Sequence, residues 1–373
     1  MTRPICRVLV TGANGFIGKN LVLRLREQAG TEVLTYVRGQ DDAALYEALG
    51  QCDAVVHLAG ENRPADVQAF AEINTGLTDR VCQGLRALGK KTPLIFASSA
   101  QAELDNPYGR SKLAAERVVQ ALANDHDNSV AIYRLPGVFG KWCKPNYNSV
   151  VATFCYNKAH DLPVQINDAG ATVRLVYVDD VINAMLGQLA SEWTGLIRPT
   201  IAPEYSISLG ELSAQIDAFK NCRSSLVSER VGTGLTRALY ATYVSYLPVD
   251  KFAYDVPVHG VARGVFVEML KTPDAGQFSF FTAHPGITRG GHYHHTKTEK
   301  FLVIKGHARF GFRHMLTDEV FYIETSGDTP KVVDTVPGWT HDITNMGDEE
   351  MVVMLWANEI FDRENPDTFT SKV

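Results

Sequence analysis

Short apolar runs alternate with longer amphipathic stretches along the first half of the chain. Five runs rich in Val, Ile and Leu are typical of buried strands, at residues 7–10, 32–37, 54–57, 94–97 and 130–133. Between them, apolar residues recur with a helical period at residues 17–28, 67–88 and 112–123. This alternation of strands and helices predicts a doubly wound parallel sheet with helices on both faces.

The pattern loosens between residues 146 and 247, as in a substrate-binding lobe, and then changes in character. Beyond it, Gly and Pro separate short alternating segments at 264–270, 277–283, 301–305, 308–312, 319–324 and 351–356. No convincing amphipathic helix lies between these segments, so they predict an all-β barrel of the jelly-roll kind. A chain of 373 residues is long enough for two domains. We expect them at residues 1–247 and 248–373.

Composition narrows the classes of function. A net charge of −6 gives no basic excess, so we expect no nucleic-acid partner and no binding to an anionic membrane. The apolar run Val8–Val10 is too short for a signal peptide or a membrane span. The six cysteines are scattered without a CxxC pair, which favours reduced thiols and a cytoplasmic location.

The turn after the first predicted strand carries three glycines at a spacing suited to a dinucleotide. Gly12 permits a tight turn, Gly15 lets the backbone approach a pyrophosphate, and Gly18 allows the helix to pack closely on the strand. Free N–H groups at the helix start then face the phosphates. An ordinary glycine turn is the alternative, but the position between strand and helix favours a Rossmann-type cofactor site. The expected contacts in this turn are Gly12, Asn14, Gly15, Phe16, Ile17 and Gly18.

The second predicted strand indicates which dinucleotide the chain prefers. It ends at Arg38, where an NAD enzyme usually places an acidic residue on the ribose 2′-hydroxyl. Because a guanidinium suits a 2′-phosphate, we expect NADPH; the alternative is a solvated surface arginine. The adenosine side of the cofactor should lie near Leu58, Ala59 and Gly60.

A serine, a tyrosine and a lysine form the predicted hydride-transfer site. Ser99 closes the strand at 94–97, while Tyr108 and Lys112 lie four residues apart on one face of the next helix. We expect the Lys112 ammonium to lower the pKa of the Tyr108 phenol, which then donates a proton near neutral pH. Ser99 can hydrogen-bond the same substrate carbonyl oxygen. Tyr108 and Lys112 should also contact the cofactor.

The C-terminal half holds a predicted metal site. His292 and His294 lie two apart, so on a strand they point to the same side, and Glu299 begins the next strand. His341 can reach inward from a later strand. Three imidazoles and a carboxylate suit one divalent ion, with zinc as first choice and iron, nickel or manganese as alternatives. A metal-free barrel is the competing interpretation.

The motifs together resemble two known families. Residues 1–247 are similar to the extended short-chain dehydrogenase/reductases that act on nucleotide sugars, through TGANGFIG at 11–18, HLAG at 57–60, ASS at 97–99, YGRSK at 108–112, RLPGVFG at 134–140 and VYVDDV at 176–181. Residues from about 250 to 373 resemble the cupin superfamily, through the spacing from Gly286 to Gly306. Two departures stand out: the loop between Ser99 and Tyr108 is short, and the second cupin motif has Pro337 and Gly338 adjacent.

The fusion resembles the bifunctional nucleotide-sugar reductases of capsule and O-antigen synthesis. That resemblance implies a UDP-2-acetamido-2,6-dideoxy-4-keto-hexose as substrate, C3 epimerisation in the cupin domain and then NADPH-dependent reduction at C4. The implied product is UDP-N-acetyl-6-deoxy-L-talosamine, on the way to UDP-N-acetyl-L-fucosamine, and a homodimer is expected. A plain 4-keto reductase with a structural or dimerising cupin is the second hypothesis, and a non-catalytic NADPH sensor is the third. The C3 base stays open among Tyr293, His295 and Lys297, and for any one of them the favoured interpretation is an ordinary residue at the rim of the site.

Overall fold

The structure is a computed structural model that describes most of the chain. The described residues are 7–62, 66, 70–261, 264–267, 269–270, 272, 276–359, 362 and 364–373. They form two compact units. The first contains Met1–Phe139, Tyr147–Ser149 and Val173–Ser206, and the second contains Gly140–Asn146, Val150–Thr172 and Ile207–Val373. The functional boundary expected near residue 247 stays a prediction. Among the described residues, no helix is both long and apolar enough to cross a membrane.

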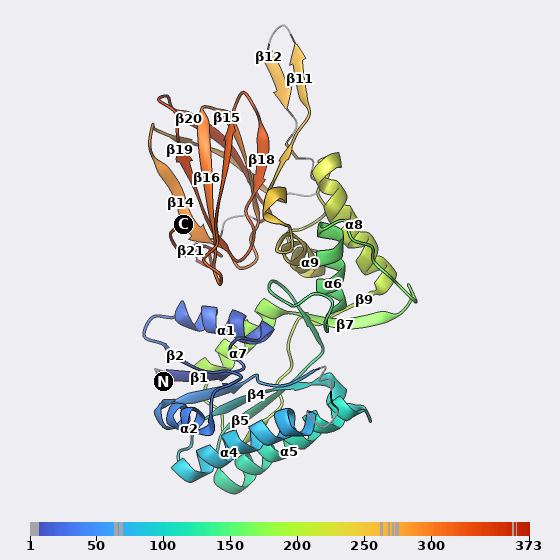
Figure 1. The fold of residues 1–373 in the computed structure, drawn as a ribbon, viewed down its shortest axis with the longest axis vertical. Coiled ribbons are helices and arrows are strands. Elements are labelled where there is room, and N and C mark those ends of the chain that lie inside the picture. The colour runs from blue at the N-terminus through green and yellow to red at the C-terminus, as the bar shows by residue number, and fades with distance from the viewer. Residues whose placement is uncertain are drawn as a thin grey trace. The chain divides into compact units, whose positions relative to one another are not determined.

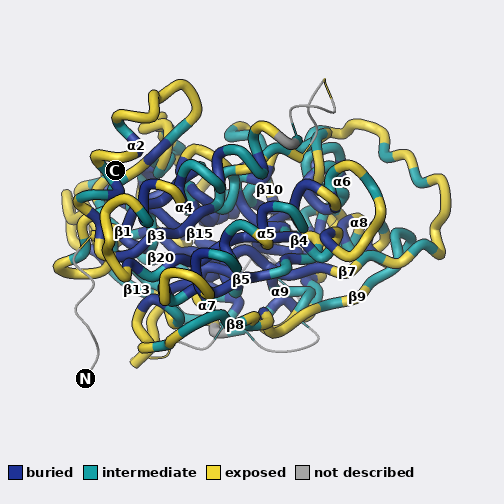
Figure 2. Tube along the Cα trace, turned by 90° about the horizontal axis from the view of Figure 1, so that it is seen from below, coloured by how far each residue is buried: buried dark blue, intermediate teal, exposed yellow. Residues whose placement is uncertain are grey.

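A six-stranded parallel sheet forms the centre of the first unit. Its order is β2 (Glu32–Tyr36), β1 (Arg7–Thr11), β3 (Ala54–His57), β4 (Leu94–Ser99), β5 (Val130–Leu135) and β8 (Leu196–Ile197). Val8, Leu9 and Val10 are fully buried, because helices cover both faces of the sheet. Figure 2 shows the central strands in the dark blue of buried residues. The predicted parallel sheet is confirmed.

Two helical layers cover this sheet (Figure 1). One face carries α1 (Phe16–Arg26) and α7 (Val178–Ala190), and the other carries α2 (Asp42–Gln51), α4 (Leu77–Leu88) and α5 (Pro107–His126). Short helices η1 (Ala71–Gly76) and η2 (Ala100–Glu103) precede α4 and α5. Asn106 caps α5 through a 2.7 Å bond from the Gly109 N–H, and Pro107 occupies its first turn. A separate small sheet contains β6 (Gly137–Phe139), β7 (Thr172–Tyr177) and β9 (Tyr205–Ser208).

Two five-stranded antiparallel sheets dominate the second unit. One has the order β10 (Ala253–Asp255), β18 (Lys331–Asp334), β15 (Glu299–Lys305), β20 (Met351–Ala357) and β13 (Gln277–Ala283). The other has the order β17 (Val320–Ser326), β16 (His307–His314), β19 (Trp339–Asn345), β14 (Thr288–Tyr293) and β21 (Phe369–Thr370). Buried aromatic side chains, among them Phe301, Phe310 and Phe312, fill the core. The predicted all-β C-terminal part is confirmed.

Three helices belong to the second unit together with the strands: α6 (Val150–Ala159), α8 (Leu209–Ser225) and α9 (Gly234–Val244). Buried polar contacts join them to the β-structure. Arg223 of α8 lies 2.5 Å from Asp334, which also pairs with Lys300 at 2.6 Å. The short helix η3 (Val249–Lys251) and the hairpin β11 (Val258–Val261)–β12 (Gly264–Val267) complete the unit. Residue 268 of the predicted strand 264–270 lies outside the described residues.

Candidate cofactor and metal sites

The glycine turn between β1 and α1 is too crowded for side chains. Gly12 has a φ of +68°, and a Cβ on it would lie 2.7 Å from the backbone N of Ala59. A Cβ on Gly18 would lie 2.8 Å from the Cα of Ala13. Helix α1 starts after Gly15 with no side-chain cap and no acidic residue in its first turn. Its first N–H groups, which belong to the turn predicted to hold phosphates, therefore fit an anionic ligand.

Arg38 lies beside the segment that follows β3. Its guanidinium pairs with the Glu61 carboxylate at 2.8 Å, and its side chain is 79% exposed. The other oxygen of the same carboxylate accepts a 2.8 Å hydrogen bond from the Tyr147 hydroxyl. Ala59 donates its N–H to the Thr11 hydroxyl at 3.3 Å, which holds residues 58–60 against the glycine turn. A 2′-phosphate on Arg38 would therefore compete with Glu61, a partner that the sequence analysis missed.

The three predicted hydride-transfer residues lie together at the carboxyl end of β4. A hydrogen bond joins the Ser99 and Tyr108 hydroxyls. Lys112 is 5% exposed and donates from Nζ to the backbone carbonyl of Ala97 at 2.7 Å. The end of β4 lies against the first turns of α5, and Tyr108 and Lys112 share the helix face that points to it. This packing brings the three residues together.

The expected effect of Lys112 on Tyr108 is wrong for this structure. Burial raises the pKa of Tyr108, and the hydrogen bond with Ser99 opposes that rise only in part. The pKa of Lys112 is itself lowered to about 8, because burial penalises its charge more than Glu116 favours it. Tyr108 is therefore protonated at neutral pH, the state that a proton donor requires.

Two buried polar residues that carry no sequence motif support this cluster. The Asn74 amide accepts from the Glu61 N–H at 2.7 Å and donates to the Ser111 hydroxyl at 3.0 Å. Glu116 accepts from the Ser98 hydroxyl, and it accepts two bonds from Arg134 at 2.9 and 2.7 Å. Both residues brace α5, the helix of Tyr108 and Lys112, against its neighbours. Only the tertiary fold reveals them.

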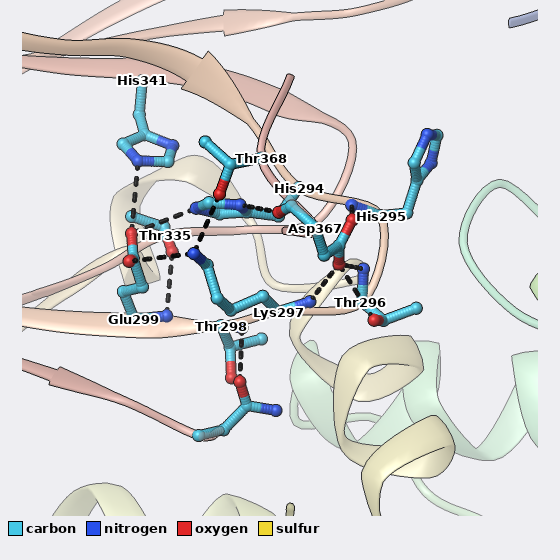
Figure 3. Close-up of polar contacts among 11 residues, drawn as sticks. His294, His295, Thr296, Lys297, Thr298, Glu299, Thr335, His341, Asp367 and Thr368 are labelled. Atoms are coloured by element: carbon cyan, nitrogen blue, oxygen red, sulfur yellow. Dashed lines mark hydrogen bonds and ion pairs between the residues drawn. The ribbon is translucent and has the colours of Figure 1, made fainter. Parts of the chain in front are cut away.

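The second unit brings His292, His294, Glu299 and His341 together. One possible ligand atom from each lies within 4.8 Å of the others. Strands β14 and β19 pair with His292 directly opposite His341, which places both imidazoles on the same side. In Figure 3, His294 and His341 point to the carboxylate of Glu299, at 3.1 and 3.5 Å from its Oε2.

The protonation states in this cluster suit a cation. Burial, with His341 and His294 nearby, lowers the pKa of His292 to about 3, so its imidazole is neutral. Burial would raise the pKa of Glu299, but the neighbouring His294 and His341 rings hold it well below the usual range. Both ring nitrogens of His341 are buried and have no hydrogen-bond partner among the described residues. A neutral His292 imidazole and an ionised Glu299 carboxylate are in the states that bind a divalent metal, so the residues fit the predicted ion.

A cavity of about 190 Å³ opens onto three of these four residues. Its wall combines His292, Glu299 and His341 with Phe281, Arg289 and Phe301. Roughly six waters at their liquid volume would fill this space. The cavity therefore gives a small molecule access to the candidate metal ligands from within the β-structure.

Two known families match different parts of the chain. Residues 8–195 match the NAD dependent epimerase/dehydratase family. The chain belongs to this family. Residues 259–369 match the polysaccharide biosynthesis C-terminal domain. The expected relationship to short-chain reductases with a second, cupin-like domain is confirmed.

Similar proteins share both halves. A UDP-2-acetamido-2,6-beta-L-arabino-hexul-4-ose reductase of Pseudomonas aeruginosa is 55% identical over 98% of this chain and 99% of its own. Among solved structures, the capsular polysaccharide assembling protein CapF of Staphylococcus aureus is 41% identical, with a TM-score of 0.67 over 98% of this chain and 100% of its own. CapF with the inhibitor 3-isopropenyl-tropolone is 37% identical, with a TM-score of 0.62 over 98% of this chain and 100% of that chain. This member of the epimerase/dehydratase family is therefore CapF-like over 98% of the chain.

Proposed function

We propose that the chain is a bifunctional nucleotide-sugar enzyme. It epimerises C3 of a UDP-2-acetamido-2,6-dideoxy-4-keto-hexose in the C-terminal domain, residues 248–373. It then reduces C4 with NADPH in residues 1–247, to give UDP-N-acetyl-6-deoxy-L-talosamine on the way to UDP-N-acetyl-L-fucosamine. The observation that carries the proposal is one chain holding two separate reactive clusters: Ser99 with Tyr108, and the four-residue His/Glu cluster on a cavity.

The reductase activity in this proposal is supported by relatives that match nearly the whole chain. Reduction of a 4-keto nucleotide sugar for capsular polysaccharide follows from the names of the two proteins with 55% and 41% identity. The preference for NADPH rests on Arg38, which follows the end of β2 and pairs with Glu61, the residue after the segment 58–60. A homodimer is part of the proposal, and light scattering of the purified protein tests it.

In the reductive step, the chain's residues handle the substrate oxygen. Bound NADPH supplies the hydride to C4. Tyr108, protonated at neutral pH, donates a proton to the C4 oxygen, and the Ser99 hydroxyl orients the same oxygen through a hydrogen bond. Lys112, held by the carbonyl of Ala97, lies one helical turn from Tyr108. Lys112 thereby holds the end of β4 against α5, and we assign it the role of positioning the bound cofactor.

In the epimerising step, a proton leaves C3 and returns on the other face. The C4 ketone makes that proton acidic, and an ion on His292, His294, Glu299 and His341, zinc by preference, would stabilise the resulting charge. Of the three residues considered as the base, Lys297 reaches the cluster, with Nζ 3.7 Å from Glu299. His295 points away from Glu299 in Figure 3 and packs on Tyr293 and Phe369. Of the three, Lys297 is therefore the one whose side chain lies nearest the candidate metal ligands.

One experiment separates this proposal from a plain reductase with a structural cupin and from a sensor. The protein is incubated with the UDP-4-keto sugar in deuterated water, with and without NADPH. Deuterium at C3 without NADPH supports the bifunctional enzyme. NADPH oxidation with no deuterium at C3 supports the plain reductase, and neither signal supports the sensor.

Two variants then assign each reaction to its cluster. The double variant His292→Ala with Glu299→Ala should lose C3 exchange and keep NADPH binding. Tyr108→Phe should keep C3 exchange and lose reduction. Circular dichroism first establishes that both variants fold. The opposite pattern would show that the two reactions have been assigned to the wrong domains.

A further inference from the structure

The last residues of the chain form a strap over the strand that carries the first metal-ligand candidates. Within this C-terminal strap (residues 367–371), Thr370 pairs with His292 and Phe369 with Tyr293 in the β21–β14 ladder. The Phe369 ring stacks on Tyr293 with a centroid distance of 5.5 Å. Ser371 donates its N–H to the carbonyl of Gly291 at 2.9 Å. The strap therefore fixes the edge of β14 that faces away from β19.

Asp367, at the start of the strap, holds the loop that leads from His294 to Glu299. Its carboxylate accepts the backbone N–H groups of His295, Thr296 and Lys297 at 2.9, 2.6 and 2.7 Å. It also accepts the Thr296 hydroxyl at 2.9 Å (Figure 3). Successive N–H groups that converge on one anion form a nest, so the loop is shaped around this carboxylate.

The backbone of Asp367 acts on a candidate ligand directly. Its carbonyl oxygen lies 2.5 Å from Nδ1 of His294. A carbonyl can only accept, so Nδ1 of His294 carries the proton, and in the neutral ring Nε2 presents its lone pair. That lone pair points to the Glu299 carboxylate oxygen, 3.1 Å away. Two lone pairs that face each other at this distance require a cation or a proton between them.

We infer that Asp367 is a positioning residue of the metal site, whose carboxylate shapes the 295–297 loop and whose carbonyl fixes the tautomer of His294. The inference rests on the metal site in the proposed function and extends it to the C-terminus. Partners of this kind orient ligands and tune affinity, and their loss typically weakens metal binding by about 10- to 100-fold. The C-terminal strap is thus part of the metal site, although it contributes no ligand.

The test measures metal binding in the full-length protein, without any assay of turnover. Co²⁺ and Zn²⁺ affinities are determined by competition with a chelator for wild type, Asp367→Asn and Asp362→Asn. Asp362 is the matched control, because it is exposed and, among the residues that the structure describes, accepts local bonds from residues 364 and 365. We expect about 10- to 100-fold weaker binding for Asp367→Asn and no change for the control. At saturating Co²⁺, the visible absorption of Asp367→Asn should also differ from that of wild type, since the ligands are displaced.

Each outcome decides the inference. Wild-type affinity together with a wild-type cobalt spectrum in Asp367→Asn overturns the role of Asp367 and leaves the metal site standing. A wild-type protein that binds neither ion overturns the metal site, and the role of Asp367 falls with it. If Asp367→Asn does not fold, Asp367→Glu takes its place. It keeps the charge but misplaces the carboxylate, so weaker binding with an altered spectrum supports the inference and wild-type behaviour refutes it.

Discussion

Replacing the buried Lys112 by methionine should stabilise the protein while it removes the reductase activity. Lys112 is 5% exposed, and burial lowers its pKa from 10.5 to about 8, with Glu116 as a weaker opposing influence. A depressed pKa for a base means that the folded state binds the proton less tightly than the unfolded state does. The charged lysine is thus a cost to folding that serves the site.

The size of this cost follows from the fall in pKa. A fall from 10.5 to about 8 corresponds to about 3 kcal/mol of destabilisation, fully present below pH 8. The free energy of unfolding of wild type should rise between pH 8 and 10.5, where the unfolded chain binds more protons. Lys112→Met removes this cost but forfeits the bond to the Ala97 carbonyl, worth about 1 to 2 kcal/mol. The net gain is therefore about 1 to 2 kcal/mol at pH 7, and it disappears by about pH 10.

Urea unfolding of the cofactor-free protein at pH 7 and pH 10 measures this difference. Other groups titrate in the same range, but they are common to both proteins and cancel in the comparison. The matched control is Lys91→Met, since Lys91 is 61% exposed and its partners, the Asp127 carboxylate and the backbone carbonyl of His126, lie at the surface. Its effect should be small and nearly independent of pH. A Lys112→Met variant that is equally or less stable than wild type at pH 7, or a difference that does not change with pH, would refute the reasoning.

Three further substitutions test the reductase cluster and its cofactor site. Tyr108→Phe removes the proton donor at almost constant shape, so reduction monitored by NADPH absorbance should fall at least roughly 100-fold; a near wild-type rate would exclude Tyr108 as the acid. Arg38→Ala should weaken NADPH binding by about 1–3 kcal/mol and NADH binding much less, measured by calorimetry, and equal losses would contradict the assignment. Gly18→Ala places a Cβ 2.8 Å from the Cα of Ala13, which forces α1 away from the turn. Binding of both dinucleotides should then be lost, and normal binding would contradict this account of the turn.

The parts of the fold that the sequence predicts are those with an unbroken hydrophobic pattern. Strands β1, β3, β4 and β5 are buried on both faces and therefore appear as continuous apolar runs. Strands β14 and β19 were not among the segments predicted from alternation, and only the histidine spacing placed His292 and His341 on strands. Their inward positions hold histidines instead of apolar residues, so the alternation that marks a half-buried strand is broken by the site itself.

Sequence spacing also fails to predict properties that depend on burial and on contacts between residues distant in the sequence. The YxxxK spacing brings Lys112 near Tyr108 but does not show how deeply both are buried, so the predicted direction of the Tyr108 pKa was wrong. Glu61 and Asp367 carry no motif, since each acts through residues distant in the sequence: Glu61 pairs with Arg38, and Asp367 holds the loop at 295–297. Neither pairing follows from local pattern.

The order of the two proposed reactions follows from their chemistry. The C3 proton is acidic only while C4 is a ketone, so reduction ends all exchange at C3 and locks the configuration present at that moment. Slowing the reductase should therefore leave more time for exchange, whereas removing the His/Glu cluster should leave reduction to act on the unepimerised sugar. With NADPH in deuterated water, we expect deuterium at C3 of the reduced product of wild type. The variant His292→Ala with Glu299→Ala should give slow reduction to the other C3 configuration without deuterium, or no product. Deuterium in its product would place the C3 chemistry outside the His/Glu cluster.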